Sequence, residues 1–234
     1  MGPMQFKNVA DAPHPHTDPE RRRLRLALAL SLLFHALLLS LTFGGQGGSG
    51  ASGAVLIKGM AGATTVMDSA TLSSGDSVTL QLSKPAVTSS NTFTLGGTGA
   101  KVIESTSTQD SFGAAVNLTG LAVSSDSTSV RVGKTTNTAA LTLGTSWTVA
   151  GPLTVIAGSI TLNTSSALSS SGAMTLTASA GDISLSSNTI VTGSGNQLLL
   201  KATGAVNGAA AVTQRTNGGH LIIWSDSDAS VPSV

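Results

Sequence analysis

Short runs in which apolar and polar side chains alternate recur along the chain after residue 54. Residues 78–82, 130–132 and 141–143 are examples, and in each of them every second side chain is Val or Leu. A two-residue period is typical of β-strands with one buried face, and the Gly, Ser, Asn and Asp residues between the runs are typical of turns. Because no stretch after residue 54 keeps the helical period, this region is predicted to be all-β.

From residue 151 onward the apolar runs repeat at a nearly constant interval, in three series of strand positions. Their members are Leu153, Met174, Leu198 and Leu221; Ile160, Ile183 and Val206; and Leu168, Ile190 and Val212. A coil with three strands per turn explains this pattern, because each strand pairs in parallel with its counterpart one turn away. The sequence therefore predicts a right-handed parallel β-helix with turns of about 22–23 residues; a β-sandwich is the alternative.

The alternation also predicts which side chains form the core. In the run that contains Ile183, Ser184 and Leu185, the two aliphatic side chains are expected to point into the coil and the serine outward. A narrow aliphatic core agrees with a chain that is 40% hydrophobic but only 3% aromatic. Residues 151–234 are expected to form the regular turns, and residues 54–150 a less regular β-rich part of the same helix.

A different pattern precedes the β-rich region. Residues 1–25 are polar and rich in Pro, and are expected to form a disordered basic leader, whereas residues 26–43 are an uncharged apolar run. As a helix this run is about 27 Å long, close to the ~30 Å hydrocarbon core of a membrane. The charges before it are Arg21, Arg22, Arg23 and Arg25. They predict a cytoplasmic N-terminus and place residues 44–234 outside the membrane.

Two interpretations of residues 26–43 stay open. The run is longer than the apolar core of an ordinary signal peptide, which favours an uncleaved membrane anchor. The Gly- and Ser-rich segment 44–53, expected to be a flexible linker, also offers small residues suited to signal cleavage. The expected location is the cell envelope, with residues 44–234 periplasmic or extracellular, or secreted after cleavage. A buried helix of a soluble domain is a weaker alternative.

Three polar side chains interrupt the apolar run. Ser31, His35 and Thr42 fall on one narrow stripe of a helix, because successive residues are turned by about 100°. Residues 21–43 resemble the N-terminal anchor of TonB-type energy transducers, which carries a Ser and a His four residues apart. The resemblance implies a proton-driven motor complex as partner, and the two matching residues here are Ser31 and His35.

The repeat region carries a second resemblance. The segments Thr-Leu-Thr-Ala at 175–178, Gly-Asp-Ile-Ser-Leu at 181–185 and the closing segment 218–228 are similar to the repeats of filamentous-haemagglutinin-type exoproteins. The similarity covers about residues 140–228, and residues 54–139 more loosely. Members of that family are secreted bacterial adhesins with β-helical shafts. The resemblance implies an adhesive or matrix-forming protein whose partner is a surface glycan or a host receptor.

Composition narrows the chemistry. The chain has only 12 basic and 11 acidic side chains and a net charge of +1, so bulk electrostatics do not support nucleic-acid binding. The absence of Cys excludes disulfides, thiolate metal sites and Cys nucleophiles. Between residues 151 and 220 the one carboxylate is Asp182, expected to be a turn residue, and Asp226 and Asp228 follow near the C-terminal end. We therefore expect no enzyme, and no catalytic, cofactor or metal site.

The alternative of a β-helical enzyme acting on polysaccharides needs clustered carboxylates. The region around Glu104 and Asp110 is where such a cluster would be sought. The aromatic side chains that would stack on sugars are scarce, and Trp147 and Trp224 are expected to be core or capping residues.

The last apolar run suggests how copies of the chain associate. It consists of Leu221, Ile222, Ile223 and Trp224. The last strand of a β-helix has unpaired backbone groups on one side, which can pair with another chain. With a net charge near zero, long-range repulsion does not oppose this contact. The sequence thus predicts a homo-oligomer formed by end-to-end stacking.

Overall fold

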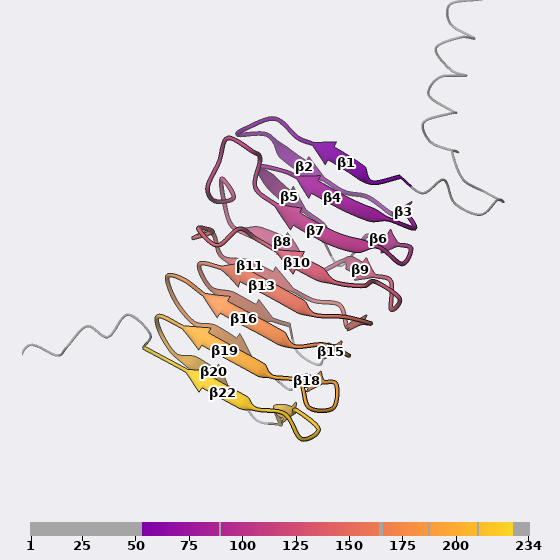
Figure 1. Cartoon of the computed structure of the whole chain (residues 1–234). Coiled ribbons are helices and arrows are strands. Elements are labelled where there is room, and N and C mark those ends of the chain that lie inside the picture. The colour runs from indigo at the N-terminus through magenta and orange to yellow at the C-terminus, as the bar shows by residue number, and fades with distance from the viewer. Residues whose placement is uncertain (1–52, 89, 164–165, 187, 210, 227–234) are drawn as a thin grey trace, which may run out of the picture. The chain divides into compact units, whose positions relative to one another are not determined.

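The computed structural model describes residues 53–226, apart from positions 89, 164, 165, 187 and 210. Its regular elements in this part of the chain are 22 β-strands, which wind round a common axis in groups of three (Figure 1). Strands of successive turns pair in parallel, so that the sheets run along the solenoid. The predicted all-β parallel β-helix is confirmed.

The strands form three faces. The first face is an eight-stranded sheet made of β1 (Val55–Lys58), β4 (Ser77–Gln81), β7 (Ala100–Glu104), β10 (Val130–Val132), β13 (Leu153–Ala157), β16 (Met174–Ala178), β19 (Leu198–Ala202) and β22 (Leu221–Trp224). The second is a seven-stranded sheet of β2 (Thr64–Val66), β5 (Lys84–Ala86), β8 (Val116–Leu118), β11 (Leu141–Leu143), β14 (Ile160–Leu162), β17 (Ile183–Leu185) and β20 (Val206–Gly208). The third is divided into a three-stranded sheet, β3 (Ala70–Ser73), β6 (Phe93–Gly96) and β9 (Leu121–Val123), and a four-stranded sheet, β12 (Trp147–Val149), β15 (Ala167–Ser170), β18 (Thr189–Thr192) and β21 (Thr213–Arg215).

The register of the regular turns follows the first two predicted series. Strand pairing aligns Leu153, Met174, Leu198 and Leu221 on the first face. On the second face Ile160 pairs with Ile183, and Ile183 with Val206. The two predicted series are confirmed.

The third series is wrong at its last step. Leu168 pairs with Ile190 as predicted, but the partner of Ile190 is Gln214 and not Val212. Ala211 has a φ of 65°, in the left-handed region, and Val212 lies in the turn before β21 while still packing against the core. Val212 therefore has the spacing of a strand position without being one.

The same turns extend into the region expected to be less regular. Val55 pairs with Val78, and Val78 pairs with Lys101, so that the first two repeats have the same number of residues. The following step, from Lys101 to Val130, is longer, because a longer connection links β7 to β8. Irregularity in this part lies in the connections, and the strands continue the three faces.

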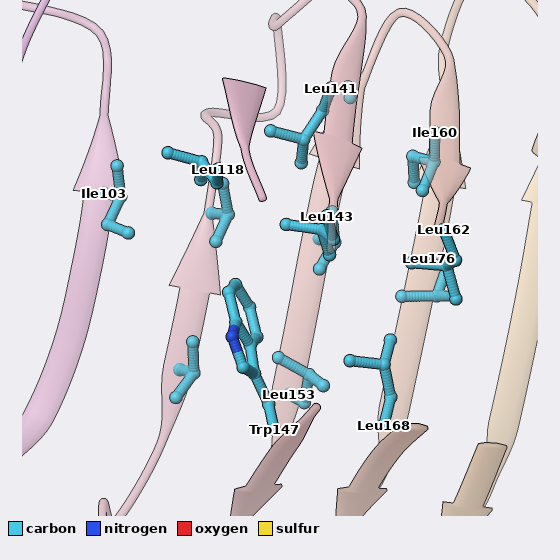
Figure 2. Close-up of a cluster of buried hydrophobic side chains, with 14 of the residues drawn as sticks. Ile103, Leu118, Leu141, Leu143, Trp147, Leu153, Ile160, Leu162, Leu168 and Leu176 are labelled. Atoms are coloured by element: carbon cyan, nitrogen blue, oxygen red, sulfur yellow. The ribbon is translucent and has the colours of Figure 1, made fainter. Parts of the chain in front are cut away.

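The core is a column of aliphatic side chains contributed by all three faces. Ile183 and Leu185 are buried and Ser184 is half-buried, as the alternation predicts. Trp147 is also buried, and Figure 2 shows its ring among leucine and isoleucine side chains of neighbouring turns. Its indole Nε1 donates a hydrogen bond of 2.8 Å to the Leu121 carbonyl oxygen. The prediction of a core role is confirmed for this tryptophan.

Polar side chains bind the corners of successive turns together. The Nδ2 of buried Asn188 donates to the carbonyl oxygens of Asn163 and Ser166 at 2.7 and 3.0 Å. At other corners the backbones of successive turns lie close together. A Cβ on Gly158 would lie 1.9 Å from the Thr138 carbonyl oxygen. Buried backbone acceptors need partners, so these contacts hold the stacking distance between turns.

Candidate functional site

The last strand of the first face is an exposed apolar edge. All four side chains of β22 are exposed, at 40% to 52% of their accessible surface. In β16 and β19, inside the same sheet, buried and half-buried side chains alternate. Leu221 and Ile223 continue the inward rows of Leu198 and Leu200. The inward-row side chains of β22, Leu221 and Ile223, are exposed because among the described strands β22 has a neighbour on one side only.

Trp224 contacts a cation at this edge. In the register of β19 and β22 it lies beside Lys201, whose Nζ is 4.7 Å from the centre of the indole ring. This distance is within the range of a cation–π interaction. Trp224 is not a core residue, since 52% of its surface is exposed, and the alternative that it caps the last turn stays a prediction. The residue has no described strand beyond it to cover the ring.

The opposite end of the solenoid is apolar as well. Leu56, Ile57, Met60 and Val66 are exposed there, at 41% to 80%. This edge was not predicted from the sequence. One repeat step back from Val78 reaches Val55, so the repeat itself would have located β1. Like β22, β1 has one strand neighbour among the strands that the structure describes in the first sheet.

The strongest ionic group on the flank is centred on Glu104. Its Oε2 accepts a hydrogen bond of 2.7 Å from Arg131 Nη2, and its Oε1 accepts one of 2.9 Å from Gln81 Nε2. Burial alone would raise the pKa of Glu104, but the hydrogen bonds from Gln81 and Arg131 and the charges of Arg131 and Lys134 outweigh it and lower the pKa. Glu104 is therefore held as an anion, which is the wrong form for a general acid.

The carboxylate of Asp182 serves a turn. Asp182 accepts hydrogen bonds from the Ala205 backbone N–H at 2.8 Å and from Asn207 Nδ2 at 3.1 Å, in agreement with the predicted turn role. The backbone N–H of Asp226 donates to the Gly204 carbonyl oxygen at 2.8 Å, and Asp228 lies outside the described residues. Within the ranges that the structure describes, no three His, Asp or Glu side chains are grouped so as to hold a metal ion.

The predicted membrane residues cannot be placed on this framework. Ser31, His35 and Thr42, with the whole run 26–43, lie outside the described residues. Among residues 53–226, apart from the five undescribed positions, no helix has the length and hydropathy to cross a membrane.

One charged side chain lies inside the core. Lys101 is 0% exposed, and its Nζ has no hydrogen-bond partner among the described residues. Burial lowers the pKa of this amine below its ordinary value. Pairing places Lys101 between Val78 and Val130, at an inward position that the pattern reserves for aliphatic side chains. No feature of the sequence pattern pointed to this lysine, because a lysine in a strand is ordinarily expected to face outward.

Comparisons with known proteins do not assign the chain to a family. No protein-family model matches the chain, and no curated protein or solved structure matches it. The filamentous-haemagglutinin and TonB resemblances stay predictions.

Proposed function

We propose that the chain is an exported, non-enzymatic structural protein of the bacterial cell surface. In this proposal the solenoid is the shaft of an adhesive fibre or matrix, and copies associate through the apolar last strand. The observation that carries the proposal is the distribution of side chains: β22 exposes Leu221, Ile222, Ile223 and Trp224 together, whereas the outward row of the second sheet is polar over the five turns from Asn117 to Asn207. Contiguous exposed apolar surface is typical of sites that contact other proteins.

The flank of the second sheet supports a passive shaft. Its outward row is formed by Asn117, Thr142, Thr161, Ser184 and Asn207, one from each of five successive turns. Amide and hydroxyl groups repeated at the strand spacing of about 4.8 Å suit many weak hydrogen bonds to an extended polar partner, such as a surface glycan. These five side chains include no carboxylate that could act as an acid or base.

The two alternative functions have less support. An enzyme acting on polysaccharides would use the region of Glu104, but that carboxylate is paired with Arg131 and its pKa is lowered. A TonB-like transducer would need a compact C-terminal α/β domain, whereas the described residues form a solenoid of strands. Neither alternative explains an apolar edge at β22.

Light scattering over a concentration series tests the proposal with the full-length chain in a mild detergent. The wild type is expected to increase in mass with concentration. Ile222→Lys combined with Trp224→Lys should keep the chain monomeric, because two lysines on the exposed edge strand oppose its pairing with another chain. The matched control is Thr175→Lys with Thr177→Lys, at half-buried outward positions of β16.

The control should associate as the wild type does, since it adds the same charges at the same spacing on an internal strand. A wild type that stays monomeric at every concentration would contradict the proposal. So would an edge variant that associates as strongly as the wild type, since association would then use another surface.

A further inference from the structure

The two exposed edges belong to one sheet. β1 is the first and β22 the last strand of the eight-stranded first face, and both are four-residue strands. All strands of this sheet run in the same direction, so β1 of another copy in the same orientation can continue the sheet at β22. Two β22 edges that keep their inward rows on the same side would have to pair antiparallel. A head-to-tail contact between different edges is the kind that builds open filaments.

We propose that the partner of β22 is β1 of a second copy, with Leu56 beside Ile222 and Lys58 beside Trp224. This inference rests on the proposed function and identifies the partner and the register. It places the Trp224 ring between two lysines, Lys201 of its own chain and Lys58 of the next.

The alternation of side chains determines the register. In β1, Val55 and Ile57 pair with the buried Val78 and Leu80, so they belong to the inward rows. In β22 the inward rows continue through Leu221 and Ile223. A slip of one residue would turn each apolar row outward. Aligning inward with inward along the whole of both strands places Val55 beside Leu221 and Ile57 beside Ile223.

The outward rows then become complementary. Trp224 already has the Lys201 ammonium 4.7 Å from its ring centre, on the side of β19. The other side of the β22 strand is exposed, and in the proposed register it receives Lys58, which is exposed in the single chain. An indole ring attracts a cation at each of its two faces. The lysine at the end of β1 therefore has a specific partner on the second copy.

The contact is confined to the first face. That sheet is eight-stranded and the second is seven-stranded, so β22 projects one strand beyond β20. A second copy meets β22 first, through the four-residue strand on each side. An interface of this size is much smaller than that of an obligate dimer. Association is therefore expected to depend on concentration.

Cysteine cross-linking of the full-length chain tests the register, because the sequence has no Cys. Leu56→Cys and Ile222→Cys are purified separately, mixed, and treated with a mild oxidant. A cross-linked dimer is expected in the mixture and not in either variant alone. The register control is Ile57→Cys mixed with Ile222→Cys, which should link far less, because Ile57 belongs to the inward row and Ile222 to the outward row, and these rows lie on opposite faces of the sheet.

Charge removal tests the tryptophan contact separately. Lys58→Ala is expected to weaken association about two- to fivefold, as the loss of one cation–π contact would. Lys84→Ala, on the flank strand β5, is the matched control and should leave association unchanged. Equal association of the wild type and Lys58→Ala would overturn the predicted contact.

The outcomes separate this inference from the proposed function. If the wild type associates and the β22 lysine variant does not, but Leu56→Cys fails to link to Ile222→Cys, only the partner assignment is wrong. Efficient linking of Ile222→Cys to itself would overturn the inference in favour of pairing between two C-terminal edges. If the wild type does not associate at all, the proposed function is wrong and this inference is wrong with it.

Discussion

Among the described residues, one buried lysine occupies a position of the core that is otherwise aliphatic. Lys101 lies in register between Val78 and Val130, and its amine is buried without a hydrogen-bond partner among the described residues. A buried, unpaired ammonium is costly, and the usual response is a shift toward the neutral amine. The lowered pKa of Lys101 has this cause. The residue is expected to reduce the stability of the turn that contains it.

Lys101→Met is therefore expected to stabilise the protein at pH 7, by about 1–3 kcal/mol, because Met has a similar length and no unsatisfied donor. The folded pKa is below the unfolded value of about 10.4, so the unfolded chain binds more protons between these two values. Wild-type stability should then rise as pH approaches 10, and its difference from Lys101→Met should shrink. Thermal unfolding followed by circular dichroism from pH 7 to 10 measures both effects.

Lys134 provides a control in which the same substitution should lower the stability of the protein. Its Nζ donates hydrogen bonds of 2.7 and 2.6 Å to the carbonyl oxygens of Thr106 and Gln109. Lys134→Met removes both bonds and should destabilise the chain. A destabilising Lys101→Met would show that the buried amine has a partner in solution, and a gain that does not change with pH would show that burial does not lower the pKa of Lys101 into this range.

At the scale of the strand, the two faces of β17 differ in what they tolerate. Ile183 is fully buried and Ser184 is half-buried in the outward row. Ile183→Asp should destabilise the solenoid by several kcal/mol, since it buries an unpaired charge. Ser184→Asp should change stability by no more than about 0.5 kcal/mol. Denaturant unfolding of both variants makes the comparison.

Ile183→Ala keeps this comparison measurable if the aspartate variant does not fold. Its expected loss is about 2–5 kcal/mol, the range for truncating a buried aliphatic side chain. Equal unfolding midpoints for the substitutions at 183 and 184 would contradict the assignment of inward and outward faces.

The strands also show why part of the fold was predictable from sequence. The series through Ile160, Ile183 and Val206 keeps a constant step, so its register was visible. The step from Lys101 to Val130 was hidden, because a longer connection changes the spacing and a lysine occupies the inward position. Local periodicity therefore predicts pairing well only where every turn has a similar length.

The exposure of the apolar edge strands depends on the order of the strands in the sheet. Leu221 to Trp224 were predicted as an exposed end because they are the last apolar run, and the exposure of β22 agrees with that prediction. The core alternative for Trp224 was wrong because aromatic residues are usually buried, whereas strand order leaves this ring with no described strand beyond it. The contact between Trp224 and Lys201 depends on the register of β19 with β22, and this register is set by how the two neighbouring turns pair.

At the scale of the whole solenoid, β1 and β22 lie at opposite ends of the first face (Figure 1). At the usual spacing between paired strands, they are roughly 34 Å apart. Apolar exposure is concentrated at these ends, while the outward row of the second face is polar from Asn117 to Asn207. The ends of the solenoid are thus apolar, whereas this row on its second face is polar. The ends suit growth by addition of copies, and the polar row suits contact with a polar ligand.

The pairing of each strand with the next turn has a mechanical consequence. Interstrand hydrogen bonds run along the solenoid axis, so tension between Val55 and Trp224 loads one strand pair at a time. Each turn that peels away should lengthen the chain by about 75 Å, the extended length of one repeat. Single-molecule pulling from these two positions is expected to give a series of small steps of this size, whereas one abrupt extension of the whole solenoid would contradict it. A cell held through such a shaft would be attached by an extensible spring that yields turn by turn under load and rewinds when the load falls.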